Sequence, residues 1–344
     1  MKQTLPSYAS LLPGIFLCVA VTGLASLLQI VEQDVAGQAY LEALVLAILL
    51  GVAIRTAWRP GALWSPGIRF SGKFLLEVAV VLLGASVSAR TVLALGPKLL
   101  LGIMVVVAVS ICTSYLVCRL LKLPQRMSIL VACGNSICGN SAIAAVAPVI
   151  GADGDDIASS IAFTAVLGVI VVLLLPLLVP VLLLSLTQYG VLAGLTVYAV
   201  PQVLAATLPI GALSNQVGTV VKLVRVLMLG PVVLVISLLT AGLREAESTQ
   251  KSKFPKLSQM VPWFIAGFLA ILLIRSLGWI PTPIIAPIKY IAGLLTTISM
   301  AALGLGVDVR VVAKAGGRVT AAVTISLIIL GIISFGLIKI MRIA

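Results

Sequence analysis

The chain of 344 residues contains no histidine and few charged residues. Without an imidazole, a histidine pH switch is excluded, and proton coupling would have to use carboxylates, tyrosine or lysine. Charged residues make up 10% of the sequence, against about 25% in soluble proteins, and hydrophobic residues make up 61%. The composition therefore excludes an ordinary soluble domain and predicts an all-α polytopic membrane protein.

Metal-binding and hydrolytic chemistry lack their usual side chains. Hydrolysis usually needs histidine, a carboxylate pair or a metal, and the chain has only 10 acidic residues. The cysteines lie in or beside apolar stretches and show no zinc-type spacing. They are Cys18, Cys112, Cys118, Cys133 and Cys138. We expect no cofactor, no metal site and no enzyme activity.

The net charge of +13 has a topological explanation. In a soluble protein it would suggest a nucleic-acid partner, but here basic residues occupy short loops. Loops near residues 32–42 and 153–156 are acidic, which places them outside. The basic groups around residues 55–73, 119–126, 244–256 and 310–318 then lie inside. This bias predicts a cytoplasmic N-terminus, a periplasmic C-terminus and no nucleic-acid partner.

Apolar stretches of membrane-spanning length recur about eleven times, which predicts one transmembrane domain over residues 1–344. A loop holding Pro60, Gly61, Pro66 and Gly67 should separate the second helix from the third. The expected helices are 9–31, 40–57, 72–88, 97–119, 127–150, 157–184, 190–209, 220–241, 260–277, 284–307 and 317–341. The segment 190–209 is interrupted by Pro201, so a full membrane crossing there is the weakest expectation.

The run from Gly134 to Ser141 repeats the unit Gly-Asn-Ser within an apolar segment. Glycine and asparagine oppose helix continuity, and a broken helix in a bilayer leaves backbone dipoles free to bind a ligand. The N-terminus of the second half-helix favours an anion, whereas carbonyls ending the first half favour a cation. Close helix packing by small residues is the structural alternative.

Helix spacing suggests two inverted repeats after an extra helix at 9–31. Repeat one covers about 40–184 and repeat two about 190–341, so the broken fifth helix corresponds to the tenth. The middle of the tenth helix, 294–300, is then expected to hold a second break. Its candidate ligands are Thr296, Thr297 and Ser299, although such hydroxyls often bond back to their own helix.

Ionisable residues near membrane depth point to function because they are costly there. Lys222 and Arg225 are three residues apart, so they share one helix face and could attract an oxyanion. Snorkelling to the membrane surface is the alternative. Glu77, early in the third helix, could pair with one of them, take part in coupling, or lie at the surface.

Several segments resemble one family of bacterial membrane proteins. They are Asn135–Ile150, Ser65–Lys73, Val221–Pro231, Pro262–Phe264 and Ala301–Leu305. Together they are similar to the YeiH-type inner-membrane proteins, a family named for sulfate export within the bile-acid, arsenite and riboflavin transporter superfamily. The resemblance implies a panel and a core domain, two crossed broken helices and alternating access in the bacterial inner membrane. Tyr198 stands where relatives tend to have histidine, and Glu77 where many have arginine, so coupling and substrate are not carried over.

The leading hypothesis is a secondary transporter of a small anion such as sulfate, a sulfonate or an organic anion. Alternatives are a sodium-coupled symporter of an organic solute, a passive channel and a non-transporting scaffold. The expected partners are the anion and the lipid bilayer; the coupling ion and a homodimer are left open. Substrate-binding candidates are Gly134, Asn135, Ser136, Gly139, Asn140, Ser141, Thr296, Thr297, Ser299, Lys222 and Arg225. Coupling or gating candidates are Glu77, Tyr198 and Gln202, and sodium could use Asn135, Asn140 and Thr297.

Overall fold

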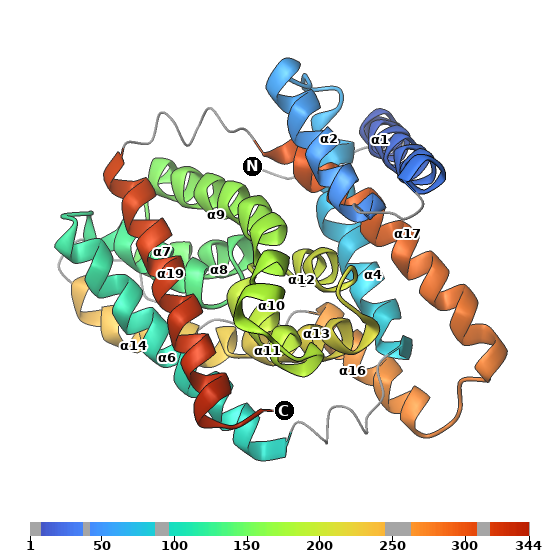
Figure 1. Cartoon of the computed structure of the whole chain (residues 1–344). Coiled ribbons are helices and arrows are strands. Elements are labelled where there is room, and N and C mark those ends of the chain that lie inside the picture. Colours follow the sequence, from blue (N-terminus) through green and yellow to red (C-terminus); the bar gives the residue numbers. More distant parts are fainter. Residues whose placement is uncertain (1–7, 37–41, 87–95, 245–262, 308–316, 344) are drawn as a thin grey trace. The chain divides into compact units, whose positions relative to one another are not determined.

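The computed structural model describes residues 8–36, 42–86, 96–244, 263–307 and 317–343 (Figure 1). Every regular element within these ranges is helical, and none of them contains a strand. The predicted all-α class is therefore confirmed for this part of the chain. The chain forms two compact units: unit 1 comprises residues 1–89 and 267–310, and unit 2 comprises 90–266 and 311–344.

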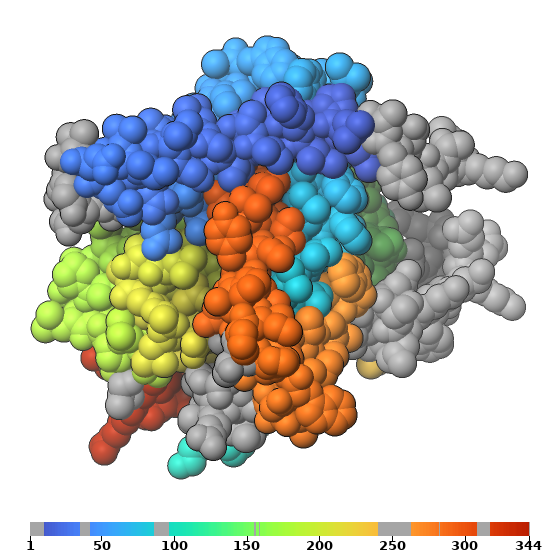
Figure 2. Space-filling view, turned by 90° about the vertical axis from the view of Figure 1, so that its right-hand side faces the viewer, coloured from blue at the N-terminus to red at the C-terminus, as the bar shows by residue number. Residues whose placement is uncertain are grey.

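Unit 1 is built around the long helix α17, which packs against α2 and α4. Figure 2 shows α17, in orange, running down this face with α1, in dark blue, crossing its upper part. A Cβ atom at Gly304 would lie 2.3 Å from the Ile48 carbonyl oxygen, so glycine is needed where α17 meets α2. The elements are α1 (Tyr8–Ala36), α2 (Ala43–Ala57), α3 (Ser65–Phe70), the π-helix η1 (Ser71–Leu75), α4 (Leu76–Leu83), η2 (Gly84–Ser86), most of α16 (Trp263–Ser276) and α17 (Thr282–Gly306).

Unit 2 contains two helices that are each divided into halves, α7–α8 and α11–α12. The first half of one, α7, packs between α6 and α9, and the first half of the other, α11, packs against α13 and α19 (Figure 1). The elements are α6 (Gly96–Leu120), α7 (Gln125–Ser136), α8 (Asn140–Ile150), α9 (Gly154–Leu174), η3 (Leu175–Leu177), α10 (Leu178–Leu182), α11 (Leu186–Thr196), α12 (Val200–Thr207), α13 (Ala212–Leu227), α14 (Leu229–Arg244) and α19 (Gly317–Ile340).

Within the described ranges, 6 helical segments are long and apolar enough to cross a membrane. They are Ser10–Asp34, Gly96–Leu120, Ser159–Leu182, Ala212–Leu239, Pro283–Gly306 and Gly317–Ile340. Shorter apolar helices are Ala43–Ala57, Asn140–Ile150 and Trp263–Ser276. The eleven spans and the inverted repeats stay predictions. The expected helix ends at 87–88 and 260–262 lie outside the described residues.

The loop predicted before the third helix was expected to extend to residue 71, and this prediction is wrong. α3 already begins at Ser65, with Pro66 in its first turn. Proline is tolerated there because the first N–H groups of a helix have no intrahelical partner. Gly67 lies against α1 instead of forming a turn: a Cβ there would be 2.1 Å from the Leu11 carbonyl oxygen.

The predicted second break at 294–300 is also wrong, because α17 is a continuous helix from Thr282 to Gly306. Thr296 donates to the Ala292 carbonyl at 2.7 Å, and Thr297 donates to that of Gly293 at 3.0 Å. Ser299 donates to the Leu295 carbonyl at 2.7 Å in the same way. These hydroxyls bond within their own helix, and no glycine or proline interrupts residues 294–300.

Candidate functional site

The first interruption in unit 2 lies between Ser136, the last residue of α7, and Asn140, the first of α8. Gly139 has φ 64° and ψ −124°, a conformation that favours glycine, and its N–H donates to the Gly134 carbonyl at 2.8 Å. The carbonyls of Asn135 and Ser136 therefore lose the N–H donors that a continuous helix would provide. Asn135 and Ser136 are fully buried, whereas Asn140 is exposed.

The second interruption lies at 197–199, between α11 and α12. Val197 and Ala199 are extended, with ψ 144° and 150°. In a continuous helix the residue at 201 would donate to the Val197 carbonyl, but Pro201 has no N–H. Gln202 accepts a hydrogen bond from the Ala199 N–H at 3.1 Å, which places this gating candidate at the start of α12.

Lys222 and Arg225 of α13 join the two interruptions. The Lys222 ammonium donates to the carbonyls of Ile137, at 2.7 Å, and Val197, at 2.8 Å. Three nitrogen atoms of the Arg225 guanidinium donate to the carbonyls of Ser136 at 2.6 Å, Val197 at 3.2 Å and Asn135 at 2.5 Å. The side chains are 0% and 1% exposed, so the snorkelling alternative is wrong.

Glycines bring α13 close enough to α11 for these contacts. A Cβ atom at Gly194 would lie 2.6 Å from the Gly218 carbonyl oxygen, and one at Gly190 would lie 2.7 Å from that of Ser214. Such small residues let two helix backbones approach closely. Lys222 follows Gly218 by one helical turn, so the close contact places its ammonium beside the end of α11.

Both asparagines of the Gly-Asn-Ser units accept a hydrogen bond from a hydroxyl group. Tyr198, in the second interruption, donates to Oδ1 of Asn135 at 2.7 Å. Thr164 of α9 donates to Oδ1 of Asn140 at 2.6 Å. Within the described residues, Asn135 Nδ2 and Ser136 Oγ are buried and have no hydrogen-bond partner. Unsatisfied buried polar groups of this kind call for a ligand or water.

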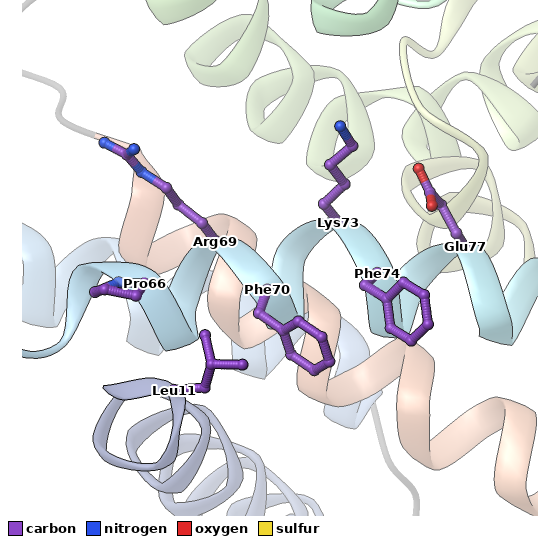
Figure 3. Close-up of a pocket in the computed structure, with 7 residues that line it drawn as sticks. All are labelled: Leu11, Pro66, Arg69, Phe70, Lys73, Phe74 and Glu77. Atoms are coloured by element: carbon purple, nitrogen blue, oxygen red, sulfur yellow. The ribbon is translucent and has the colours of Figure 1, made fainter. Parts of the chain in front are cut away.

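Of the remaining candidates from the sequence, Ser141 is exposed in the first turn of α8, and the others lie in unit 1. Thr296, Thr297 and Ser299 are internal to α17, as described above. Glu77 is half-buried at the start of α4 and lines a pocket of about 370 Å³. In Figure 3, the side chains of Arg69, Lys73 and Glu77 extend from one side of their helix. The pocket is completed by Leu11, Pro66, Phe70 and Phe74.

The site in unit 2 combines two buried basic side chains with buried asparagine and serine side chains. No cluster of histidine, cysteine and carboxylate side chains that could hold a metal occurs among the described residues. Cys133 and Cys138 flank the first interruption as buried free thiols. Within the described part of the chain, the five hydrogen bonds of Lys222 and Arg225 go to backbone carbonyls and not to carboxylates.

Sequence reasoning identified Asn135, Ser136, Lys222 and Arg225 but placed their partners wrongly. It paired the first break with α17, whereas the structure pairs it with the segment at 197–199. The interruption expected near Pro201 is present, because proline removes the N–H that Val197 needs, but the sequence did not link it to the first break. Thr164 carried no signal, because one threonine in an apolar helix is ordinary.

Known proteins resemble this chain over most of its length. A family model described as conserved hypothetical protein 698 matches residues 13–323. A UPF0324 membrane protein of Brucella melitensis is 61% identical, covering 100% of this chain and 94% of the relative. One from Bradyrhizobium diazoefficiens is 59% identical, with coverage of 96% and 93%. One from Bacillus cereus is 36% identical, with coverage of 86% and 83%.

No solved structure matches the chain. The matches nevertheless extend over nearly the whole sequence, and the matched range 13–323 contains both interruptions and α13. The relatives' shared name also agrees with the apolar helices of the structure. The chain belongs to the conserved hypothetical protein 698 family, whose relatives are UPF0324 membrane proteins.

Proposed function

We propose that the protein is a secondary transporter of a small anion, which binds at the interruptions between α7 and α8 and between α11 and α12. The observation that carries the proposal is the buried pair Lys222 and Arg225 beside two free polar groups, Asn135 Nδ2 and Ser136 Oγ. Cations buried in a membrane protein are costly and mark ligand or ion pathways.

The charges at the site favour an anion over a cation. The C-terminal ends of α7 and α11 contribute about −0.5 elementary charge each through their helix dipoles, and the Arg225 guanidinium beside them contributes a full positive charge. The N-terminus of α8 adds further positive potential at Asn140. Arg225 and this N-terminus together outweigh the two C-terminal dipoles, so an anion is favoured over a sodium ion.

The closed surroundings of the site are consistent with alternating access, which would have to expose it to one side at a time. Asn135 and Ser136 are buried, while Asn140 and Ser141 at the start of α8 are exposed. An anion would therefore approach from the Asn140 side. We further propose that the protein lies in the bacterial inner membrane with a cytoplasmic N-terminus, which reporter fusions at each terminus would test.

Reconstituted vesicles test the proposal directly. Purified protein is placed in vesicles, and uptake of labelled sulfate, methanesulfonate and small carboxylates is followed. Saturable uptake of at least one anion is expected, and Asn140→Leu should abolish it. Thr113→Val is the matched control, because Thr113 is a half-buried residue of α6 whose hydroxyl bonds within its own helix. Absence of anion uptake in the wild-type protein would refute the proposal.

The sodium-coupled alternative is tested in the same vesicles by replacing sodium with N-methylglucamine. The amide oxygens of Asn135 and Asn140 each already accept a hydroxyl hydrogen bond, which leaves only one lone pair apiece for a cation, and Thr297 bonds within α17. We therefore expect uptake to continue without sodium. Conducting currents of single-channel size would instead indicate a passive channel.

A further inference from the structure

We propose that Tyr198 and Thr164 are positioning residues that turn the amide N–H₂ groups of Asn135 and Asn140 toward the ligand. The site would then select an oxyanion that carries no proton. This inference deepens the proposed anion transport and rests on it.

The orientation of Asn135 follows from the hydroxyl of Tyr198. Tyr198 is 2% exposed, so its hydroxyl proton needs an acceptor within the protein. Asn135 Oδ1 supplies it at 2.7 Å. If the amide were reversed, its N–H₂ group would face this hydroxyl and the tyrosine proton would lose that acceptor. With the oxygen held by Tyr198, the unpartnered Nδ2 is the end left for a ligand.

Asn140 is held in the same way from another helix. The Thr164 hydroxyl lies 2.6 Å from Asn140 Oδ1, closer than its distances of 3.0 Å to the Ile161 carbonyl and 3.2 Å to that of Ser160. The amide oxygen is therefore its best acceptor. Two asparagines on either side of one interruption thus have their oxygens bound by hydroxyls that approach from α9 and from the second interruption.

The backbone oxygens around the first interruption are already used in part. The carbonyls of Asn135, Ser136 and Ile137 each accept a hydrogen bond from Lys222 or Arg225, which leaves one lone pair apiece. Ser136 Oγ is buried without a partner among the described residues, and a hydroxyl can either donate or accept. A ligand O–H would have to share these oxygens with the cations that already bind them, which weakens its binding relative to an unprotonated oxyanion.

Hydrogen phosphate, sulfate and fluorophosphate provide a matched comparison. All are tetrahedral dianions at pH 8, but only hydrogen phosphate carries a proton. Affinities are measured by calorimetry on the purified full chain in lipid nanodiscs. We expect sulfate and fluorophosphate to bind about tenfold or more tightly than hydrogen phosphate, because an unsatisfied buried donor is costly.

Substitutions separate positioning from structure. Tyr198→Phe frees the Asn135 amide to rotate. The ratio of the sulfate affinity to the hydrogen phosphate affinity should then fall toward one. Thr164→Val should weaken the preference, and Thr164→Ser, which keeps a hydroxyl, should retain it. Ser136→Ala removes a buried hydroxyl that could accept a proton from the ligand, so it should increase the preference for sulfate over hydrogen phosphate. A purely structural role would alter all three affinities equally and leave their ratio unchanged.

The possible results distinguish this inference from the proposed function. Equal binding of all three anions by the wild-type chain would overturn the inference and leave anion transport standing. If Tyr198→Phe and Thr164→Val both left the preference for sulfate over hydrogen phosphate unchanged, the inference would also be overturned. The two hydroxyls would then not determine how the asparagine amides are oriented. Failure of all three anions, together with absence of anion uptake in vesicles, would overturn both.

Discussion

Arg225 Nε donates to the Ser136 carbonyl over 2.6 Å, although the two residues are 89 positions apart in the sequence. The bond joins α13 to the last residue of α7, where the backbone has lost its helical partner. Lys222 makes the equivalent contact to Ile137. Side-chain cations thus replace the missing N–H donors of two interrupted helices, and stability and function should depend on the same pair.

Replacing Arg225 by methionine should destabilise the protein strongly. The change leaves the carbonyls of Asn135 and Ser136 buried without this donor, and each unsatisfied acceptor costs about 1–3 kcal/mol. Thermal unfolding of the purified protein in detergent measures the loss. Arg225→Lys keeps the charge but not the planar donor geometry, so an intermediate loss is expected. A methionine variant as stable as the wild type would contradict the assigned contacts.

Gly139→Ala should be more harmful than Gly151→Ala, although the two glycines have nearly equal φ values of 64° and 63°. Gly151 is left-handed with open space around it, so alanine there costs about 1–2 kcal/mol. At Gly139, ψ is −124° and a Cβ atom would lie 3.2 Å from Tyr198 Cβ. Apparent melting temperatures compare the two, and equal losses would argue against a close Gly139–Tyr198 contact.

Gly194→Ala should separate α11 from α13 and weaken anion binding. The added methyl group would meet the Gly218 carbonyl at 2.6 Å, and overpacking of this kind costs about 1–3 kcal/mol. Gly331→Ala in α19 is the control, because nothing lies within 4 Å of its added Cβ. The control should be neutral or slightly stabilising. Similar melting temperatures and anion affinities for the two variants would refute the role of the close helix contact.

Thr297→Val in α17 should have little effect on anion affinity or on stability. Its hydroxyl donates to the Gly293 carbonyl four residues earlier, and valine keeps the shape of the side chain. Calorimetry against the anion transported in vesicles checks this, with Asn135→Leu as the comparison expected to lose binding. A large loss in Thr297→Val would restore α17 to the list of ligand-binding segments.

Local sequence signals predicted the helices well and their partners less well. The Gly-Asn-Ser pair located the first interruption because glycine and asparagine act on their own backbone. The spacing of Lys222 and Arg225 predicted that they share one helix face, but not whether that face is buried. The partner segment could not be derived in this way, since repeat spacing says nothing about which carbonyls lack a donor.

The threonines of α17 show why hydroxyls are weak predictors of a break. A hydroxyl in an apolar helix can be satisfied either by a ligand or by the carbonyl four residues earlier, and the sequence is the same in both cases. Pro201 acts differently, because it removes a donor whatever surrounds it. Pro201 marks an interruption in this structure, whereas Pro13, Pro148 and Pro287 lie inside α1, α8 and α17, so proline alone does not identify a break.

The contacts of Lys222 and Arg225 with the interruptions involve main-chain oxygens only. Every residue type carries such an oxygen, so this scaffold does not depend on which side chains occupy 136, 137 and 197. Side-chain substitutions at these three positions should therefore leave the five hydrogen bonds of the two cations in place. The scaffold constrains the backbone at the interruptions and leaves their side chains free to vary.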